Sequence, residues 1–238
     1  QYASIIEDKN GSALLKESEI KNMLPNDEID GLTKEDAIKK AKDICDKMNI
    51  NVHDVPYLCV AMDYENVNKI IENDPRKGTN KYGDVSYWNK SDEAYYIVFQ
   101  QEVDGVPITI SNRTANFYMI PSTSVTVIVG RNGVLKVENH GLYSADSVSD
   151  CTIIDSKKAI DILATDSMYA AIGNMTLTDM SLEYTVYYDL KSNKVTIKPM
   201  WVYTLERRTT MEKDGQTYTS ISRQTNFIDA VTGKVLGG

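Results

Sequence analysis

A similar order of elements occurs in both halves of this chain, and this repeat limits the folds that the sequence can adopt. In the second half, a helix-like run at Ser156 leads through strand-like segments to a closing hairpin between Phe227 and Leu236. In the first half, a helix-like run at Thr33 leads to a closing hairpin between Val127 and Leu135. The sequence thus predicts a duplicated scaffold, with coincidence of common helix and hairpin signals as the alternative.

The predicted fold class is α+β, with two similar lobes that each consist of an antiparallel sheet packed by one main helix. An N-terminal extension is expected at 1–30, a first lobe at 31–140 and a second lobe at 141–238. An amphipathic stretch that ends at Pro25 predicts a helix within the extension. Its apolar residues are Leu14, Leu15, Ile20, Met23 and Leu24.

The first lobe has a clear helix start and two hairpin signals. Thr33 is the expected N-cap, because Glu35 and Asp36 place acidic groups in the first turn. The hairpin signals are Asp104-Gly105 and Asn132-Gly133, each between apolar strand-like runs. Apolar residues recur at helical spacing at Ala37, Ile38, Ala41, Ile44, Cys45 and Met48. A buried strand, a short helix and a longer strand are expected at 57–62, 67–71 and 94–103.

The second lobe repeats these parts in the same order. Asp155 and Ser156 begin its helix, Asp214-Gly215 corresponds to Asp104-Gly105, and Gly233 stands where the first closing hairpin has Gly133. Two of its strands are expected at 182–188 and 195–205. The spacings of the two halves differ, and surface-loop insertions at 66–92 and 112–124 would absorb the difference.

The composition favours a globular domain and argues against nucleic-acid binding. Of 238 residues, 42% are hydrophobic and 25% are charged, which is enough apolar surface for a core. The net charge of -8 disfavours a phosphate-backbone ligand, which needs clustered basic residues. The 15 Tyr against 3 Phe favour sheets with one solvated side. No apolar run approaches the ~20 residues that span a bilayer.

The sequence has no motif of a known catalytic or metal centre, so we predict no enzyme activity, no cofactor and no metal. His53 and His140 have no candidate ligand or nucleophile in a recognised pattern, and His140 is expected in a solvated turn. Cys45, Cys59 and Cys151 lack metal-ligand spacing and are expected to be buried. The acidic segment 146–150 lacks the glycine and closing glutamate of a calcium loop, and is expected to be a solvated loop.

The candidate ligand or partner contacts are aromatic and basic. Three aromatic residues in the irregular segment either line a ligand cleft or anchor that segment to the sheet, and we favour anchoring. Trp201 is a further candidate for stacking on a ligand, and Arg207-Arg208 are the adjacent arginines of the chain. The aromatic residues of the irregular segment are Tyr82, Tyr87 and Trp88.

The second half resembles PepSY-type domains, whose ends commonly read as a strand, Asp-Ala, Thr-Gly and another strand. The residues that carry the resemblance are 156–163, Pro199-Met200-Trp201-Val202-Tyr203 and 227–235. The whole chain also resembles the double-lobed YycH/YycI regulatory proteins of Gram-positive bacteria, most clearly in its last third. The resemblance implies an extracytoplasmic protein, lipid-anchored or membrane-tethered, that contacts a sensor kinase or a peptidase. It implies no catalytic residue.

The leading hypothesis is therefore a non-catalytic, extracytoplasmic protein that binds a protein or peptide in the cell envelope and modulates signalling or proteolysis. The sequence begins at Gln1 without Met, which suggests removal of a signal peptide or lipoprotein anchor. The alternative is a lipoprotein that binds cell-wall carbohydrate or a small molecule through aromatic residues. A hydrolase that uses two carboxylates is the least supported class.

Overall fold

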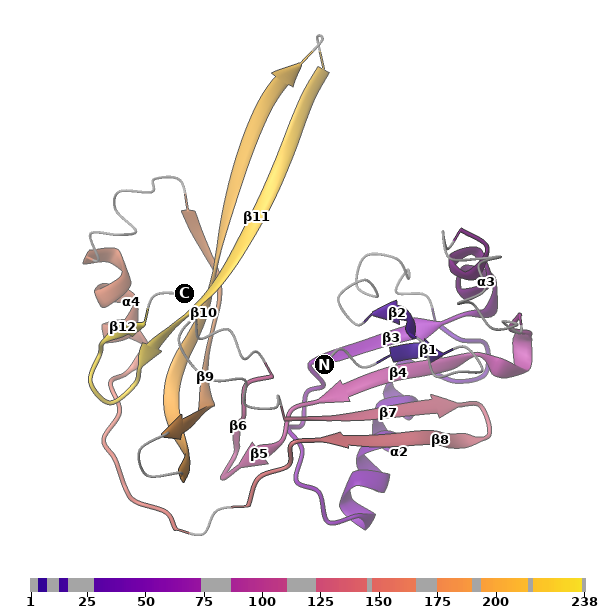
Figure 1. Ribbon diagram of the computed structural model, residues 1–238, viewed down its shortest axis with the longest axis horizontal. Helices are drawn as coiled ribbons and strands as arrows, with labels where there is room; N and C mark the ends of the chain where they lie inside the picture. The colour runs from indigo at the N-terminus through magenta and orange to yellow at the C-terminus, as the bar shows by residue number, and fades with distance from the viewer. Residues whose placement is uncertain are drawn as a thin grey trace. The chain divides into compact units, whose positions relative to one another are not determined.

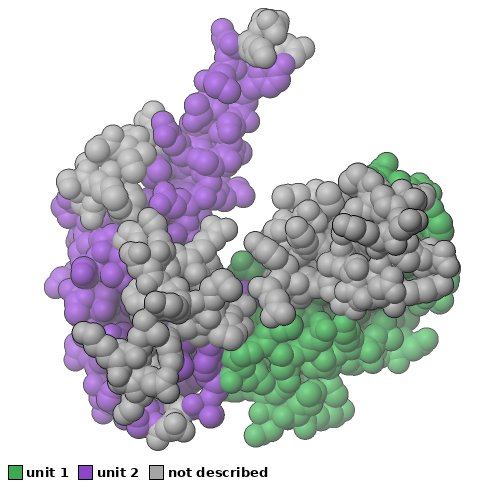
Figure 2. Space-filling view, in the orientation of Figure 1, with its two compact units in different colours: residues 1–102, 123–142 green, residues 103–122, 143–238 purple. Residues whose placement is uncertain are grey.

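The chain divides into two compact units, each with helices and antiparallel strands, so the fold is α+β. The first unit comprises 1–102 and 123–142, and the second comprises 103–122 and 143–238 (Figure 2). The predicted lobes differ from these units in 103–122, which groups with the second unit. The computed structural model describes residues 4–7, 13–16, 28–73, 87–110, 123–144, 147–165, 175–189, 194–213 and 216–236.

The first unit contains a four-stranded antiparallel sheet in which sequential strands are neighbours (Figure 1). Its order is β3-β4-β7-β8, so the chain crosses the sheet once from edge to edge. This arrangement confirms the predicted buried strand and the predicted hairpin around Asn132-Gly133. The strands are β3 (Leu58–Met62), β4 (Ala94–Phe99), β7 (Ser124–Gly130) and β8 (Gly133–His140).

Helix α2 (Lys34–Lys47) packs on one face of this sheet and begins where the sequence predicts. The Thr33 hydroxyl accepts the Asp36 backbone N–H at 3.1 Å, which satisfies one of the free donors of the first turn. The helix buries one stripe at i, i+4 spacing against alternate residues of the strands, because both patterns present one face to the core. The stripe is Ala37, Ala41 and Cys45, and the sheet residues that share its core include Tyr95, Ile97, Phe99, Val125, Val127 and Val129.

The other face of the sheet is also buried, as at Val60, Tyr96 and Val98. Helix α3 (Tyr64–Asn73) follows β3 and buries Val67 and Ile71, which confirms the predicted short helix. A 3₁₀ turn, η1 (Lys90–Asp92), precedes β4 and is closed by a capping box between Asn89 and Asp92.

The helix predicted before Pro25 is wrong for Leu14 and Leu15. They lie in β2 (Ala13–Lys16), which pairs with β1 (Ser4–Glu7) in an antiparallel ladder. The sequence signal for this pairing is Asn10-Gly11 between two short apolar runs, which is a stronger hairpin indicator than the sparse helical spacing. The other residues of the predicted helix, Ile20, Met23 and Leu24, lie outside the described residues.

The chain passes from the first unit to the second in a small hairpin of β5 (Glu102–Val103) and β6 (Val106–Pro107). Asp104 and Gly105 have φ of 50° and 79°, the positive values that a two-residue type I′ turn requires at both positions. This confirms the predicted Asp-Gly hairpin. The Thr109 N–H then donates to the Tyr184 carbonyl at 2.9 Å, which attaches the segment after the hairpin to the second unit.

In the second unit, α4 precedes a sheet of four described antiparallel strands that are neighbours in chain order, without a helix between its strands like α3 of the first unit among the described residues. The sheet order is β12-β11-β10-β9 (Figure 1). That the two units arose by duplication stays a prediction. The elements are α4 (Ser156–Thr165), β9 (Met175–Asp189), β10 (Lys194–Lys213), β11 (Gln216–Asp229) and β12 (Val235–Leu236).

Helix α4 packs on one face of the second sheet. The Asp155 carboxylate accepts the Lys158 N–H at 2.7 Å, which confirms the predicted start of the helix. The helix buries Ala159 and Leu163, and the sheet residues in the same core are Tyr203, Leu205 and Ile228. Both long strands extend past their predicted ends: 182–188 becomes Met175–Asp189, and 195–205 becomes Lys194–Lys213.

The turn between β11 and β12 is held by one aspartate. The Asp229 carboxylate accepts the N–H groups of Val231 at 2.9 Å and Thr232 at 2.8 Å. The Gly233 N–H donates to the Asp229 carbonyl at 2.8 Å, and Gly233 has a φ of 73°. An aspartate that bonds to the backbone two residues on, followed by a glycine with positive φ, is a turn mechanism that needs no ligand.

We predict that Gly233→Ala destabilises the second unit more than Gly105→Ala does. Both glycines have positive φ, which costs a non-glycine residue about 1–2 kcal/mol. A Cβ at Gly233 would also lie 3.0 Å from the Ile162 Cδ1, whereas a Cβ at Gly105 meets nothing within 4 Å. Denaturant unfolding of both variants measures the difference. An equal loss would show that α4 does not pack closely over this turn.

Candidate interaction surface

Strands β10 and β11 continue as a pair beyond the end of β9, and each described side chain of this extension is exposed. The pairing of β9 with β10 ends at Met175 and Arg207, whereas β10 and β11 remain paired to Lys213 and Gln216. Figure 1 shows the two strands alone in this region. We call residues 208–213 and 216–221 the β10–β11 ribbon.

Burial changes abruptly where the ribbon begins. On β10, Leu205 and Glu206 are buried, and each described side chain from Arg207 to Glu212 is exposed. On β11, Asn226 is buried and the side chains from Thr217 to Gln224 are exposed. The ribbon therefore contributes nothing to the core of the second unit, and its length has no evident structural purpose within that unit.

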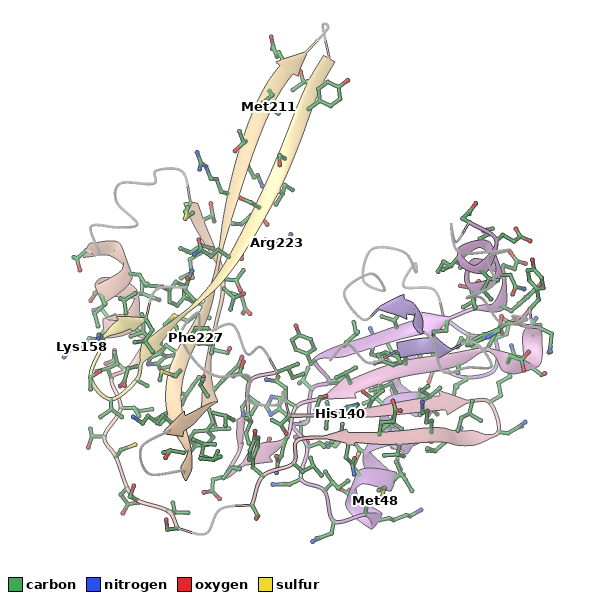
Figure 3. The ribbon with its side chains drawn as sticks, in the orientation of Figure 1. Met48, His140, Lys158, Met211, Arg223 and Phe227 are labelled. Atoms are coloured by element: carbon green, nitrogen blue, oxygen red, sulfur yellow. The ribbon has the colours of Figure 1, made fainter. Side chains whose placement is uncertain are left out.

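The ribbon carries large apolar side chains in solvent. Met211 and Tyr218 are directly opposite each other in the register and are 60% and 49% exposed. Figure 3 shows Met211 near the far end of the ribbon. Ile221 lies opposite Arg208 on the other face and is 48% exposed. Met211 and Tyr218 thus form an exposed apolar pair on one face, and Ile221 is an exposed apolar side chain on the other.

A buried carboxylate at the base of the ribbon holds two arginines. The Glu206 side chain is 7% exposed, and it accepts hydrogen bonds from Arg208 Nε at 2.8 Å and Arg223 Nε at 3.0 Å. The hydrogen bond from Arg208, with that from Arg223, lowers the pKa of Glu206, although desolvation of the carboxylate opposes this. Both arginines remain largely exposed, with 71% and 67% of the side chain accessible.

Two of the predicted contact residues, Arg207 and Arg208, therefore lie at the start of the ribbon. Neighbouring residues of a strand point to opposite faces, so Arg207 lies on the face of Met211 and Arg208 on the face of Ile221. These arginines were candidates only because they are adjacent. Met211, Tyr218 and Ile221 were not predicted, because single apolar residues between polar neighbours give no periodic signal.

Trp201, another predicted contact, is a structural anchor of the second unit. Its indole N–H donates to the Ile154 carbonyl at 3.0 Å, and its ring packs beside the α4 core. The Ile154 N–H donates to the Ala230 carbonyl at 2.8 Å. The segment before α4 is thus fixed between β10 and the β11–β12 turn, and the indole N–H is used in holding it there.

The structure describes two of the three aromatic residues of the irregular segment, and both are at least partly exposed. Tyr82 lies outside the described residues, and Tyr87 is 50% exposed. The Trp88 N–H donates to the Asn68 side-chain oxygen and the Trp88 carbonyl accepts from the Asn68 amide, both at 2.8 Å. Trp88 thus attaches its segment to α3 through its backbone, which agrees with an anchoring role.

The cysteines and histidines do not gather into a reactive group. Cys45 is buried as predicted, whereas Cys59 is only half-buried, and desolvation raises the pKa of both thiols to about 11. The prediction is wrong for Cys151, which is exposed because it lies in an irregular stretch ahead of α4. The ring of His53 is 2.8 Å from the Glu102 carboxylate, and His140 is exposed at the end of β8.

Two features of the described residues bear on function. No three His, Cys, Asp or Glu side chains come together there in a way that would hold a metal ion. None of the helices in the described ranges combines the length and the apolar character that crossing a membrane requires.

The comparisons with known proteins support the fold alone. No family model matches the chain, and no curated protein matches it. A similar solved structure is the crystal structure of an uncharacterized protein from Eubacterium rectale ATCC 33656, with a TM-score of 0.58 and 16% sequence identity. The match covers 91% of this chain and 59% of that one, so this chain spans about three-fifths of the similar protein.

We predict that Trp201→Phe lowers the free energy of unfolding of the second unit by about 1–3 kcal/mol, because the Ile154 carbonyl loses its donor. Trp88→Phe is the matched control, since the bonds of Trp88 to Asn68 use its backbone. Chemical denaturation compares the two variants. A Trp201→Phe protein of unchanged stability would contradict the anchoring role.

We also predict that the base of the ribbon loosens in acid. Glu206 has a folded-state pKa below its ordinary value of 4.5, so its pairing stabilises the fold fully above that pH. The stabilisation is lost as the pH falls through the lowered pKa, when the carboxylate is protonated. Amide exchange at Arg207 and Ser222, a directly opposite pair at the base of the ribbon, followed by NMR between pH 6 and pH 3 (about the range over which carboxylates titrate), measures this. Glu206→Gln should remove the pH dependence, and its persistence would point to another carboxylate.

Proposed function

We propose that this chain is a non-catalytic binding protein that contacts a protein or peptide partner through the β10–β11 ribbon. The observation that carries the proposal is the ribbon itself. It is a regular, fully registered pair of strands, and every described side chain of it is exposed. An isolated two-stranded ribbon is only marginally stable in water. Its length is best explained by an intermolecular contact.

The side chains of the ribbon support a protein partner. Protein interfaces are enriched in Tyr, Met and Arg, and depleted in Lys, Glu and Ser. The ribbon presents Met211 beside Tyr218 on one face and Arg208 beside Ile221 on the other. Trp201 is held within the second unit, so stacking on a carbohydrate would rest on Tyr87, Trp88 and Tyr218, of which only Tyr218 belongs to the ribbon. We therefore favour the protein partner.

We further propose that the protein acts outside the cytoplasm, anchored to the cell envelope by a lipid or a membrane segment, where partner binding modulates signalling or proteolysis. The resemblance of its last third to PepSY-type domains supports this location. That resemblance depends on the closing turn, where Asp229 and Gly233 stabilise the backbone conformation and have no catalytic role in this proposal. A scaffold of this kind is consistent with a protein that binds its partner without catalysing a reaction.

We predict that a photo-crosslinking residue at Met211 forms a discrete adduct with one envelope protein in cells of the source organism. The control position is Leu135, which is 61% exposed on β8 of the first unit. Crosslinking there should give at most about a tenth of the adduct, which is roughly the difference expected between the centre of an interface and an unrelated surface. Mass spectrometry of the adduct identifies the partner. Adducts of equal yield at both positions would contradict the proposal.

A shortened ribbon provides the complementary test. Replacing 210–219 by Asn-Gly joins Thr209 to Ser220 across their existing pair and removes no buried described side chain. The variant should keep the melting temperature of the second unit and lose capture of the partner by about tenfold or more. Retained capture by a folded variant would place the contact elsewhere in the chain.

A further inference from the structure

The outer edge of β11 lacks a neighbouring strand over most of its length. Strand β12 pairs only with Phe227 and Ile228. Among the described residues, no strand pairs with that edge from Gln216 to Asn226. A row of backbone N–H and C=O groups along an exposed edge is a template for pairing with another chain.

The hydrogen bonds at the end of β11 show which residues point outward. The Asp229 N–H donates to the Lys234 carbonyl, away from β10, whereas the Ala230 N–H donates to the Pro199 carbonyl, towards the β10 side. Along an antiparallel strand, the backbone N–H and C=O groups of successive residues point alternately to the two neighbouring sides. The β10–β11 register has no shift, so this alternation continues along β11. The outward backbone groups therefore belong to Thr217, Thr219, Ile221, Arg223 and Thr225.

Other long edges in this protein carry features that discourage such pairing. Edge strand β8 has Lys136 and Glu138, and its pairing with β7 contains a register shift. Edge strand β9 also has a register shift, and the segment at Thr109 bonds to it at Tyr184. Charges and bulges of this kind protect edges from strand addition.

The β11 edge has none of these protections between 216 and 222. That stretch has no proline, no charged residue and no register shift, and it consists of Gln, Thr, Tyr, Ser and Ile. Thr, Tyr and Ile favour strands. The unpaired edge of β10, at 208–213, is shorter and carries Arg208, Glu212 and Lys213. The edge of β11 is the better template.

The charges around the edge select the partner. The charged described side chains here are Arg207, Arg208 and Arg223 against Glu212 and the buried, paired Glu206, which leaves an excess of one positive charge. This local excess of positive charge occurs in a chain whose net charge is -8. Opposite charge steers encounter and favours acidic partners over basic ones.

We propose that the outer edge of β11, from Thr217 to Thr225, receives an extended acidic segment of the partner protein as an added strand. This inference rests on the proposed function and names how the ribbon binds. The side chains of these outward residues lie on one face of β11. In an added antiparallel strand, every second side chain would therefore lie opposite Arg223, then Ile221, then Thr219. The recognised pattern is an acidic residue, any residue, and then a β-branched apolar residue.

The test uses the whole chain and a blocked peptide, Ser-Thr-Glu-Thr-Val-Ser-Thr-Gly. NMR-detected hydrogen exchange should slow by about tenfold or more at Thr219, Ile221 and Arg223, because each gains a hydrogen bond to the added strand. Exchange at Ser220 and Ser222 should change little, because their N–H groups already face β10. Absence of protection up to the solubility limit of the peptide, or protection of both sets alike, overturns the proposal.

Matched peptides and variants distinguish the contribution of backbone pairing along the β11 edge from the contribution of side-chain contacts. A peptide with Lys in place of Glu should bind about fivefold more weakly, and Ile221→Pro should weaken binding about tenfold, because it removes an outward N–H. Ile221→Thr keeps that N–H and should bind within about threefold of the original protein. Should the proline variant misfold, methylating the peptide nitrogens that face β11 must abolish binding. Binding that survives methylation overturns strand addition.

Two further outcomes distinguish this inference from the proposed function. If the Met211 crosslink persists undiminished in a folded Ile221→Pro variant, strand addition is overturned and the ribbon remains the contact surface. If sedimentation instead shows a dimer of this chain that Ile221→Pro abolishes, the edge pairs with a second copy and the acidic partner is overturned. A sedimenting monomer with a crosslink that Ile221→Pro removes supports the proposal.

Discussion

The second unit depends on the double pairing of β10. As far as Arg207, this strand has β9 on one side and β11 on the other, and its alternate residues reach the α4 core. Beyond Arg207 it keeps only β11. The same strand is thus the centre of a packed sheet at one end and half of an exposed ribbon at the other, and the well-packed end holds the exposed end in a fixed direction.

The base of the ribbon is where these two environments meet. Glu206 is buried, yet its partners Arg208 and Arg223 are mostly exposed. A carboxylate with two charge-assisted hydrogen bonds fixes both strands at the point where the third strand ends. On the other side of the unit, Trp201 and Asp229 fix the segment before α4 and the closing turn. These polar contacts orient the scaffold, and none of them needs a ligand.

The sequence predicted elements whose signals are local and missed those that depend on pairing. Thr33 and Asp104-Gly105 were identified because capping and type I′ turns need particular residues at particular positions. The end of β10 was placed at Leu205 because the apolar alternation stops there, yet the strand continues to Lys213. A ribbon that buries nothing leaves no hydrophobic pattern. The structural bond of Trp201 to Ile154 could not be predicted, because it joins residues 47 positions apart.

The energetics of the ribbon connect its exposure to its proposed use. Two strands without a core gain only cross-strand contacts and solvent-exposed hydrogen bonds, which leaves little margin against fraying. The residues that would gain most from a third strand, Thr219, Ile221 and Arg223, are those whose backbone groups point away from β10. A partner that adds a strand completes the ladder and makes the ribbon a three-stranded sheet. The ribbon is therefore least stable where a partner would stabilise it most.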